Sequence, residues 1–258
     1  MTKLNVACIV ADTTDHWFDL SVQSALPVAD RFVFIIDKPD AHTWSVIEKA
    51  QETKQVIIIH KKYEHESKQA DGMQRTAYLE WLKKNAEGEF ALVLDTDEVL
   101  SDNCTDLFKY MQEEACWNVR MRHVWYGLGL EDATVEKHYV PRRFFKIIPT
   151  LSYPLVEHPI LTGHDAVLQV DDVCIWHMNV VKGVLEELRK YKVQCKKSNI
   201  HGPEQLLNWH KMHVLGGGII KQFDTSTLPK IVKEYCCIGE RGESVLHGEN
   251  RLCNVLGF

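Results

Sequence analysis

Three carboxylates lie directly behind an apolar run in the segment EFALVLDTDEVL, residues 89–100. Asp95, Asp97 and Glu98 follow the run, and residues i and i+2 of an extended segment project to the same side. Asp95 and Asp97 can therefore converge on one cation. Ligands that offer only oxygen favour Mg²⁺ or Mn²⁺, which can bridge the phosphates of a nucleotide diphosphate. A plainer alternative stays open, in which Asp97 and Glu98 only cap the helix that follows them.

The elements that must position these acids form an alternating pattern in the first hundred residues. Four short apolar runs, rich in β-branched residues, are typical of strands buried on both faces; they span residues 4–11, 31–37, 54–60 and 90–95. Helical patterns separate them. The clearest begins near Asp71, where Gln74 follows three residues later as in a capping box. The order predicts an α/β fold with a mainly parallel sheet. In such a sheet ligands bind at the carboxyl ends of the strands, where Asp95 and Asp97 lie.

The pattern changes after residue 100. A helix is predicted from Ser101 or Asp102, and strands are predicted near residues 117–127 and 142–148 and in a segment that ends near His177. Short helical pieces begin at Pro203 and Pro229. We therefore expect one domain over residues 1–200 and a small helical C-terminal extension over residues 201–258 that packs on it.

Composition narrows the class of protein. The formal net charge of −6 argues against broad electrostatic binding to nucleic acid. The eight cysteines form no C-x-x-C pair and no regular spacing, which favours reduced thiols in a cytoplasm over a disulfide framework. The first apolar run is too short for a signal peptide, and no window reaches the roughly 18 apolar residues needed to span a bilayer. We expect a soluble, cytoplasmic protein with no transmembrane segment.

The motifs taken together resemble a known family. EGEFALVLDTDEVL is similar to a conserved segment of family-2 glycosyltransferases of the GT-A (Rossmann-like) fold, especially the branch that modifies lipopolysaccharide cores. ADRFVFIID and DGMQRTAYLEWLKKNA resemble segments upstream of it in that branch, and YPLVEHPIL and DDVCIWHMNVVKGVLEELRKYK resemble segments downstream. The likeness keeps a consistent order over residues 4–197. It implies an inverting glycosyltransferase that uses a nucleotide-diphosphate sugar, with a uridine-diphosphate sugar as the expected donor.

The resemblance also implies roles for individual residues. Asp37 would contact the nucleotide base or ribose, and Asp95 would lie near the ribose and the metal. Asp97 would bind the metal, His177 would be a further metal ligand, and the histidine favours Mn²⁺ over Mg²⁺. The remaining donor residues implied are Asp12, Asp71 and Arg75, the last with a charge suited to a diphosphate. The Arg-Asn pair of the family is Arg75-Thr76 in this chain.

The acceptor side is less clearly marked. Inverting transfer needs a group that takes the proton of the acceptor hydroxyl. Glu157 is the first candidate for this base and Asp132 the second, although the His-Glu order of the family is inverted here as Glu157-His158. Either residue of Glu157-His158 can also be an ordinary loop or strand-end residue.

Aromatic and basic pairs add weaker signals. Trp125 and Tyr126 can form a platform on which an acceptor sugar stacks, or they can simply pack. His158 is an acceptor-site candidate beside them. Arg142 and Arg143 can contact a phosphate on the acceptor, or lie on a solvated face. The acceptor itself, whether a glycan, a lipid-linked glycan, a protein or a modified nucleic-acid base, is left open.

Two other enzyme classes compete with this interpretation. LVLDTDEV also fits the signature of haloacid-dehalogenase-like phosphatases, with Asp95 as nucleophile, Asp97 as acid/base, and Asp171 and Asp172 as later metal carboxylates. That signature normally follows the first strand of its fold, whereas three strand-like runs precede it here. A nucleotidyltransferase would use the same edge of a sheet, but its glycine-rich, lysine-bearing loop is missing from VADTTDHW. A non-catalytic sugar-binding module is a third possibility.

Overall fold

The structure is a computed structural model that describes most of the first 178 residues and two short later pieces. The described residues are 2–11, 17–64, 67, 69–112, 115–125, 129–132, 142–156, 158–178, 221–222 and 227–235. For residues 123–125 and 129–132 the description is limited to the backbone.

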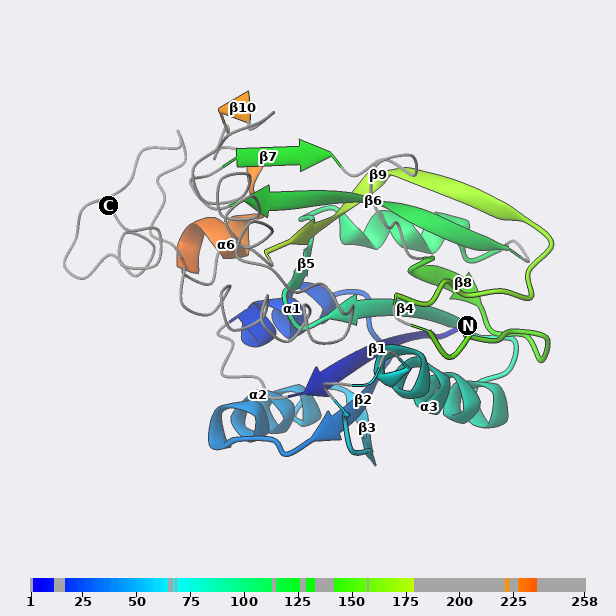
Figure 1. Ribbon diagram of the computed structural model, residues 1–258. Helices are drawn as coiled ribbons and strands as arrows, with labels where there is room; N and C mark the ends of the chain where they lie inside the picture. Colours follow the sequence, from blue (N-terminus) through cyan, green and yellow to red (C-terminus); the bar gives the residue numbers. More distant parts are fainter. Residues whose placement is uncertain are drawn as a thin grey trace, which may run out of the picture.

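Four parallel strands and three helices form the first half of the fold (Figure 1). The strands are β1 (Leu4–Ala11), β2 (Arg31–Asp37), β3 (Gln55–His60) and β4 (Phe90–Asp95), in the order β3-β2-β1-β4. The helices between them are α1 (Trp17–Ala25), α2 (Ala41–Gln51) and α3 (Ala70–Asn85). All pairings among these four strands are parallel. The predicted Rossmann-like α/β class is confirmed.

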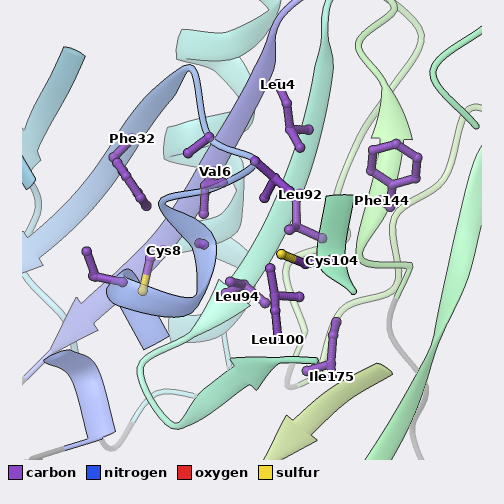
Figure 2. Close-up of a cluster of buried hydrophobic side chains, with 14 of the residues drawn as sticks. Leu4, Val6, Cys8, Phe32, Leu92, Leu94, Leu100, Cys104, Phe144 and Ile175 are labelled. Carbon is purple, nitrogen blue, oxygen red and sulfur yellow. The ribbon is translucent and has the colours of Figure 1, made fainter. Parts of the chain in front are cut away.

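Alternate residues of each strand supply two separate cores on the two faces of the sheet. One core holds Val6, Cys8 and Leu92 together with residues of α1 and α2, and Figure 2 shows part of it. The other holds Ala7 and Val93 together with residues of α3. Because most side chains of these strands are apolar on both faces of the sheet, the near-continuous apolar runs of the sequence are explained.

The second half of the sheet is mixed. Its strands are β5 (Glu98–Leu100), β6 (Cys116–Trp125), β7 (Gly129–Asp132), β8 (Phe144–Lys146), β9 (Val167–His177) and β10 (Lys221–Gln222). β8 joins β4 antiparallel and continues to β6 and β7, while β9 runs parallel to β6 and antiparallel to β5. The sheet is therefore parallel through its first four strands, as predicted, and mixed beyond them, where β9 also pairs in parallel with β6. Antiparallel neighbours need no crossover helix, and the described residues between β5 and β6 form the short 3-10 helix η1 (Cys104–Tyr110).

The predicted capping box of α3 is wrong. The residue before the helix is Gln69, whose side chain makes no capping bond, and Asp71 lies inside the first turn. The hydroxyl of Tyr63 donates to the Asp71 carboxylate instead. α2 is the helix that has a side-chain cap, because Asp40 accepts from the Thr43 N–H at 2.7 Å.

The predicted C-terminal extension lies mostly outside the described residues. Its described pieces are β10, which pairs with β7, and α6 (Lys230–Tyr235), whose first N–H donates to Asp102 at 2.9 Å. The boundary at residue 200 stays a prediction. Within the described residues, no helix combines the length and the apolar character needed to cross a membrane.

Candidate active site

The predicted acids gather at the carboxyl edge of the parallel strands. β1 lies between β2 and β4, with Ala11 beside Asp37 on one side and Ile9 beside Asp95 on the other. Asp37 and Asp95 are each the last residue of their strand. This edge is where ligands bind in α/β sheets, and parallel pairing explains why acids far apart in sequence meet there.

Asp95 is held by two arginines. Its Oδ1 lies 3.2 Å from Nη2 of Arg75, which belongs to α3, and its Oδ2 lies 2.6 Å from Nη2 of Arg143. The Arg143 guanidinium also contacts Glu98, whose second oxygen accepts from the Asp95 N–H at 2.8 Å. Arg143 and Glu98 are buried, whereas the Asp95 side chain is 30% exposed. Asp95 is thus the part of this cluster that faces outward.

The protonation of this cluster follows from burial and charge. Although burial opposes ionisation, the Arg143 and Arg75 cations hold the pKa of Asp95 well below its usual range. Burial raises the pKa of Glu98 to about 7, with Arg143 opposing the rise and the Asp95 charge adding to it. Asp95 is therefore a permanent anion at neutral pH, and its charge is shared between two guanidinium groups.

Asp97 and His177 form a second pair beside this cluster. β5 and β9 place Glu98 opposite His177, and the Met178 N–H donates to the Asp97 carbonyl at 2.7 Å. His177 Nε2 lies 3.5 Å from Asp97 Oδ1. Burial lowers the pKa of His177, but the Asp97 carboxylate raises it further, so the net direction is upward. Backbone pairing thus brings together two residues that are 80 positions apart in the sequence.

This pair suits a divalent cation that is also held by a ligand. Across the described parts of the chain, no group of three or more His, Cys, Asp or Glu side chains is arranged to hold a metal by itself. Two cis ligands at about 2.1 Å from one cation lie about 3 Å apart, so little movement of Asp97 or His177 is needed. Mg²⁺ is commonly bound through one or two carboxylates together with substrate phosphates and water, and the nitrogen ligand also suits Mn²⁺.

A short segment after β3 crosses the carboxyl edge near Asp37. The Tyr63 N–H donates to Asp37 Oδ2 at 2.8 Å, and the Tyr63 hydroxyl donates to Asp71. The side-chain amide of Gln74 donates to the Lys62 carbonyl at 2.8 Å. Burial, together with the Asp71 charge, raises the pKa of the Tyr63 phenol. The segment therefore links two predicted donor residues, Asp37 and Asp71, through one tyrosine.

Gly72 lets a second segment, Pro154–Val156, approach the first turn of α3 closely. A Cβ at this position would press on the Pro154 carbonyl oxygen and lie 2.9 Å from the Leu155 Cα. Only glycine permits that contact. The segment Pro154–Val156 therefore packs directly on the turn that carries Asp71 and precedes Arg75.

Several predicted site residues are not placed. Asp12, Tyr126 and Glu157 lie outside the described residues, and for Trp125 and Asp132 only the backbone in β6 and β7 is described. His158 is described: it is exposed and has a φ of 52°. Their predicted roles as donor, platform, base and acceptor residues stay predictions.

Two residues of the candidate site, Arg143 and Tyr63, are not indicated as donor-site residues by the sequence. The sequence predicts that Arg143 contacts an acceptor phosphate or lies on a solvated face, yet this residue is 2% exposed and its Nη2 lies 2.6 Å from Asp95 Oδ2. Tyr63 lies in a segment, HKKYEHESKQ, whose mixed charges gave no signal. The phenylalanines that follow Arg143 mark a buried strand, and this was the one available sign that Arg143 is not at the surface.

Comparison with known proteins gives only distant structural likenesses. No protein-family model matches the sequence, and no curated protein matches it. The solved structure of S. aureus TarS 1–349 is 14% identical, with a TM-score of 0.49, over 90% of this chain and 77% of that chain. TarS 1–349 in complex with UDP is 13% identical, with a TM-score of 0.48, over 98% and 83%. HddC from Yersinia pseudotuberculosis is 11% identical, with a TM-score of 0.35, over 64% and 74%.

Proposed function

We propose that this protein is a metal-dependent glycosyltransferase that moves a sugar from a nucleotide-diphosphate donor to an acceptor hydroxyl, with inversion. One observation carries the proposal: the Asp97–His177 pair lies beside an arginine-bound Asp95 at the carboxyl edge of the sheet. The pair supplies two cation ligands, and the edge is the place where a nucleotide binds in an α/β sheet. The sequence resemblance to GT-A glycosyltransferases supports the same assignment.

The donor would be held by residues of several elements. Asp97 and His177 would hold Mn²⁺ or Mg²⁺, which neutralises the charge of a departing diphosphate when bound. Asp37, at the end of β2, would contact the nucleoside, and Asp71 and Arg75 of α3 would line the opposite side. Tyr63 bonds both Asp37 and Asp71 and so links the end of β2 to the first turn of α3. A uridine-diphosphate sugar is the expected donor.

Transfer requires one bond to form as another breaks. The acceptor oxygen attacks the anomeric carbon, the bond from that carbon to the diphosphate oxygen breaks, and the diphosphate leaves with the electron pair. A carboxylate takes the acceptor proton. Glu157 is the proposed base and Asp132 the reserve. Pro154–Val156, which precede Glu157, pack on Gly72 in the turn of α3 that carries Asp71.

The phosphatase alternative has less physical support. Its nucleophile would be Asp95, but both oxygens of this carboxylate lie against guanidinium groups. Asp172, one of its expected metal carboxylates, instead contacts Lys109 and the Tyr110 hydroxyl. Asp172 also lies in the irregular stretch of β9 between Val170 and Cys174, and not at the end of β9 that carries His177. The acids that this chemistry needs are therefore not together.

A thermal-shift screen tests the proposal. Nucleotide diphosphates and nucleotide sugars are added with and without Mn²⁺ to the wild type and to Asp97→Ala. Ligand at a hundred times its Kd adds about 2.7 kcal/mol to the free energy of unfolding. We expect one nucleotide to stabilise the wild type only with Mn²⁺, and Asp97→Ala to lose this shift. Stabilisation by a phosphate mimic such as beryllium fluoride, with none by any nucleotide, would refute the proposal in favour of a phosphatase.

A further inference from the structure

The second arginine of the Arg142-Arg143 pair is built into the sheet. Arg143 immediately precedes β8, and its carbonyl accepts from the Val93 N–H at 2.7 Å, which extends the antiparallel ladder between β8 and β4. Its side chain is 3% exposed and reaches the end of β4. Backbone pairing therefore fixes where this guanidinium lies.

The contacts of Arg143 use only part of its hydrogen-bonding capacity. Nη2 contacts both Asp95 and Glu98, whereas Nε and Nη1 are buried and have no hydrogen-bond partner among the described residues. A buried donor left unpaired is costly. An arginine retained only to stabilise the fold would be expected to pair more of its donors. We therefore infer that Arg143 matters at this position for the positive charge that it places beside two carboxylates.

Asp95 and Asp97 consequently differ in environment. Each oxygen of Asp95 is within hydrogen-bonding range of a guanidinium group, while Asp97 Oδ1 faces the imidazole of His177. A divalent cation is repelled by the two guanidinium charges at Asp95. Asp97 and His177 present a carboxylate and a ring nitrogen that can both ligate it.

We propose that Arg143 is a positioning residue of the donor site: it neutralises Asp95 and Glu98, withholds Asp95 from the divalent cation, and leaves Asp97 and His177 as the protein's metal ligands. The inference rests on the proposed function and deepens it.

The first test removes the charge of Arg143. Mn²⁺ binding to the protein alone is measured by water-proton relaxation for the wild type, Arg143→Met, Arg143→Gln and Arg143→Lys. Removing one positive charge near a divalent cation should tighten Mn²⁺ binding about 10-fold in the Met and Gln variants. The Lys variant keeps the charge and should stay within about 2-fold of the wild type. A structural role alone would weaken Mn²⁺ binding or leave it unchanged, and that result would overturn the inference.

The second test does not depend on the folding of Arg143 variants. Asp95→Asn and Asp97→Asn are isosteric and remove the same charge, so electrostatic losses are matched between them. We expect Asp97→Asn to weaken Mn²⁺ binding at least about 10-fold more than Asp95→Asn, because only Asp97 is a ligand. Equal losses, or a larger loss in Asp95→Asn, would overturn the inference.

Nucleotide binding separates this inference from the proposed function. If the wild type binds no nucleotide diphosphate with Mn²⁺ but the Mn²⁺ results above are obtained, the function is wrong, and only the effect of Arg143 on which residues hold the cation stands. If nucleotide binding is Mn²⁺-dependent but the Arg143→Gln and wild-type Mn²⁺ affinities are equal, the function stands and the role of Arg143 is wrong.

Discussion

The two edges of the parallel sheet each carry a buried arginine among carboxylate and amide groups, but the arginines are paired differently. At the amino edge, Arg31 donates from Nε to Gln55 at 2.9 Å and from Nη1 to Asn5 at 2.8 Å, and it lies 3.3 Å from Glu89. Its guanidinium also lies over the Trp81 ring. At the carboxyl edge, Arg143 uses one nitrogen to contact two acids.

The difference separates a structural cluster from a candidate site. The Arg31 cluster closes on itself, since Asn5 also donates to Glu89 and to the Phe90 carbonyl at 2.9 Å each. Glu89 and Asp95 are similarly exposed, at 24% and 30% of their side chains, so the difference lies in their neighbours: Asp95 lies beside the Asp97–His177 pair. Similar residue types therefore stabilise strand starts at one edge and, under the proposed function, present charge to a ligand at the other.

The largest expected effect is at Asp97. Asp97→Ala should lower sugar transfer by more than about 100-fold, because even residues that only support metal ligands cost 10–100-fold when removed. Steady-state transfer with the donor found in the thermal-shift screen measures the effect. Asp171→Ala is the matched control: Asp171 is an exposed acid of β9, and transfer should be unchanged. Equal losses in the two variants would remove Asp97 from the site.

A substitution of Arg31 at the amino edge should lower the stability of the fold and leave the binding of Mn²⁺ and nucleotide unchanged. Arg31→Met leaves Glu89 without its cation and should lower the free energy of unfolding by about 3 kcal/mol, measured by urea denaturation. The Kd for Mn²⁺ and nucleotide should stay within about 2-fold of the wild type. A nucleotide affinity lowered 10-fold or more would show that the two edges are not separate.

Two glycines sharpen the comparison. Gly72→Ala gains helix propensity but pushes on the Pro154–Val156 backbone, so it should destabilise by about 1–3 kcal/mol and weaken nucleotide binding. Gly88→Ala is the control at the amino edge: its φ of 80° makes alanine strained, by about 1–2 kcal/mol, but no atom lies within 4 Å of the added carbon. Calorimetry and nucleotide titration check both variants. Unchanged nucleotide binding in Gly72→Ala would contradict the role given to that contact.

The smallest expected effect is at Asp40, an acid near the carboxyl edge that caps α2. Asp40→Ala should cost about 1 kcal/mol at pH 7, because it removes the side-chain cap of α2. The Thr43 N–H lowers the pKa of Asp40. The stabilisation is therefore present above the usual aspartate pKa near 4 and is lost as the pH falls through the lowered value. Urea denaturation from pH 7 to pH 2.5 should show the two proteins converging, and nucleotide affinity at pH 7 should be unchanged.

The first half of the fold was predictable from sequence because its strands are buried on both faces and so read as continuous apolar runs. The carboxyl-edge location of Asp37 and Asp95 followed from that order. In the second half the strands near residues 117–127 and 142–148 and the strand that ends at His177 were predicted, and β6, β8 and β9 lie there. Their pairing and direction were not predicted, because strands that are not separated by helices leave no sign of which neighbour each one joins. Arg143 was missed because its burial depends on the pairing of β8 with β4, a contact between residues about 50 positions apart.

The central claim is that Asp97 and His177 hold a cation that binds the donor diphosphate. Crystals soaked with Mn²⁺ and uridine diphosphate, with diffraction measured at a wavelength where manganese scatters anomalously, test it directly. The account predicts one manganese peak within about 2.3 Å of an Asp97 oxygen, His177 Nε2 and a diphosphate oxygen, with Asp95 still bound to Arg75 and Arg143. A manganese ligated by Asp95 in place of Asp97 and His177, or a nucleotide bound away from this edge, would contradict it.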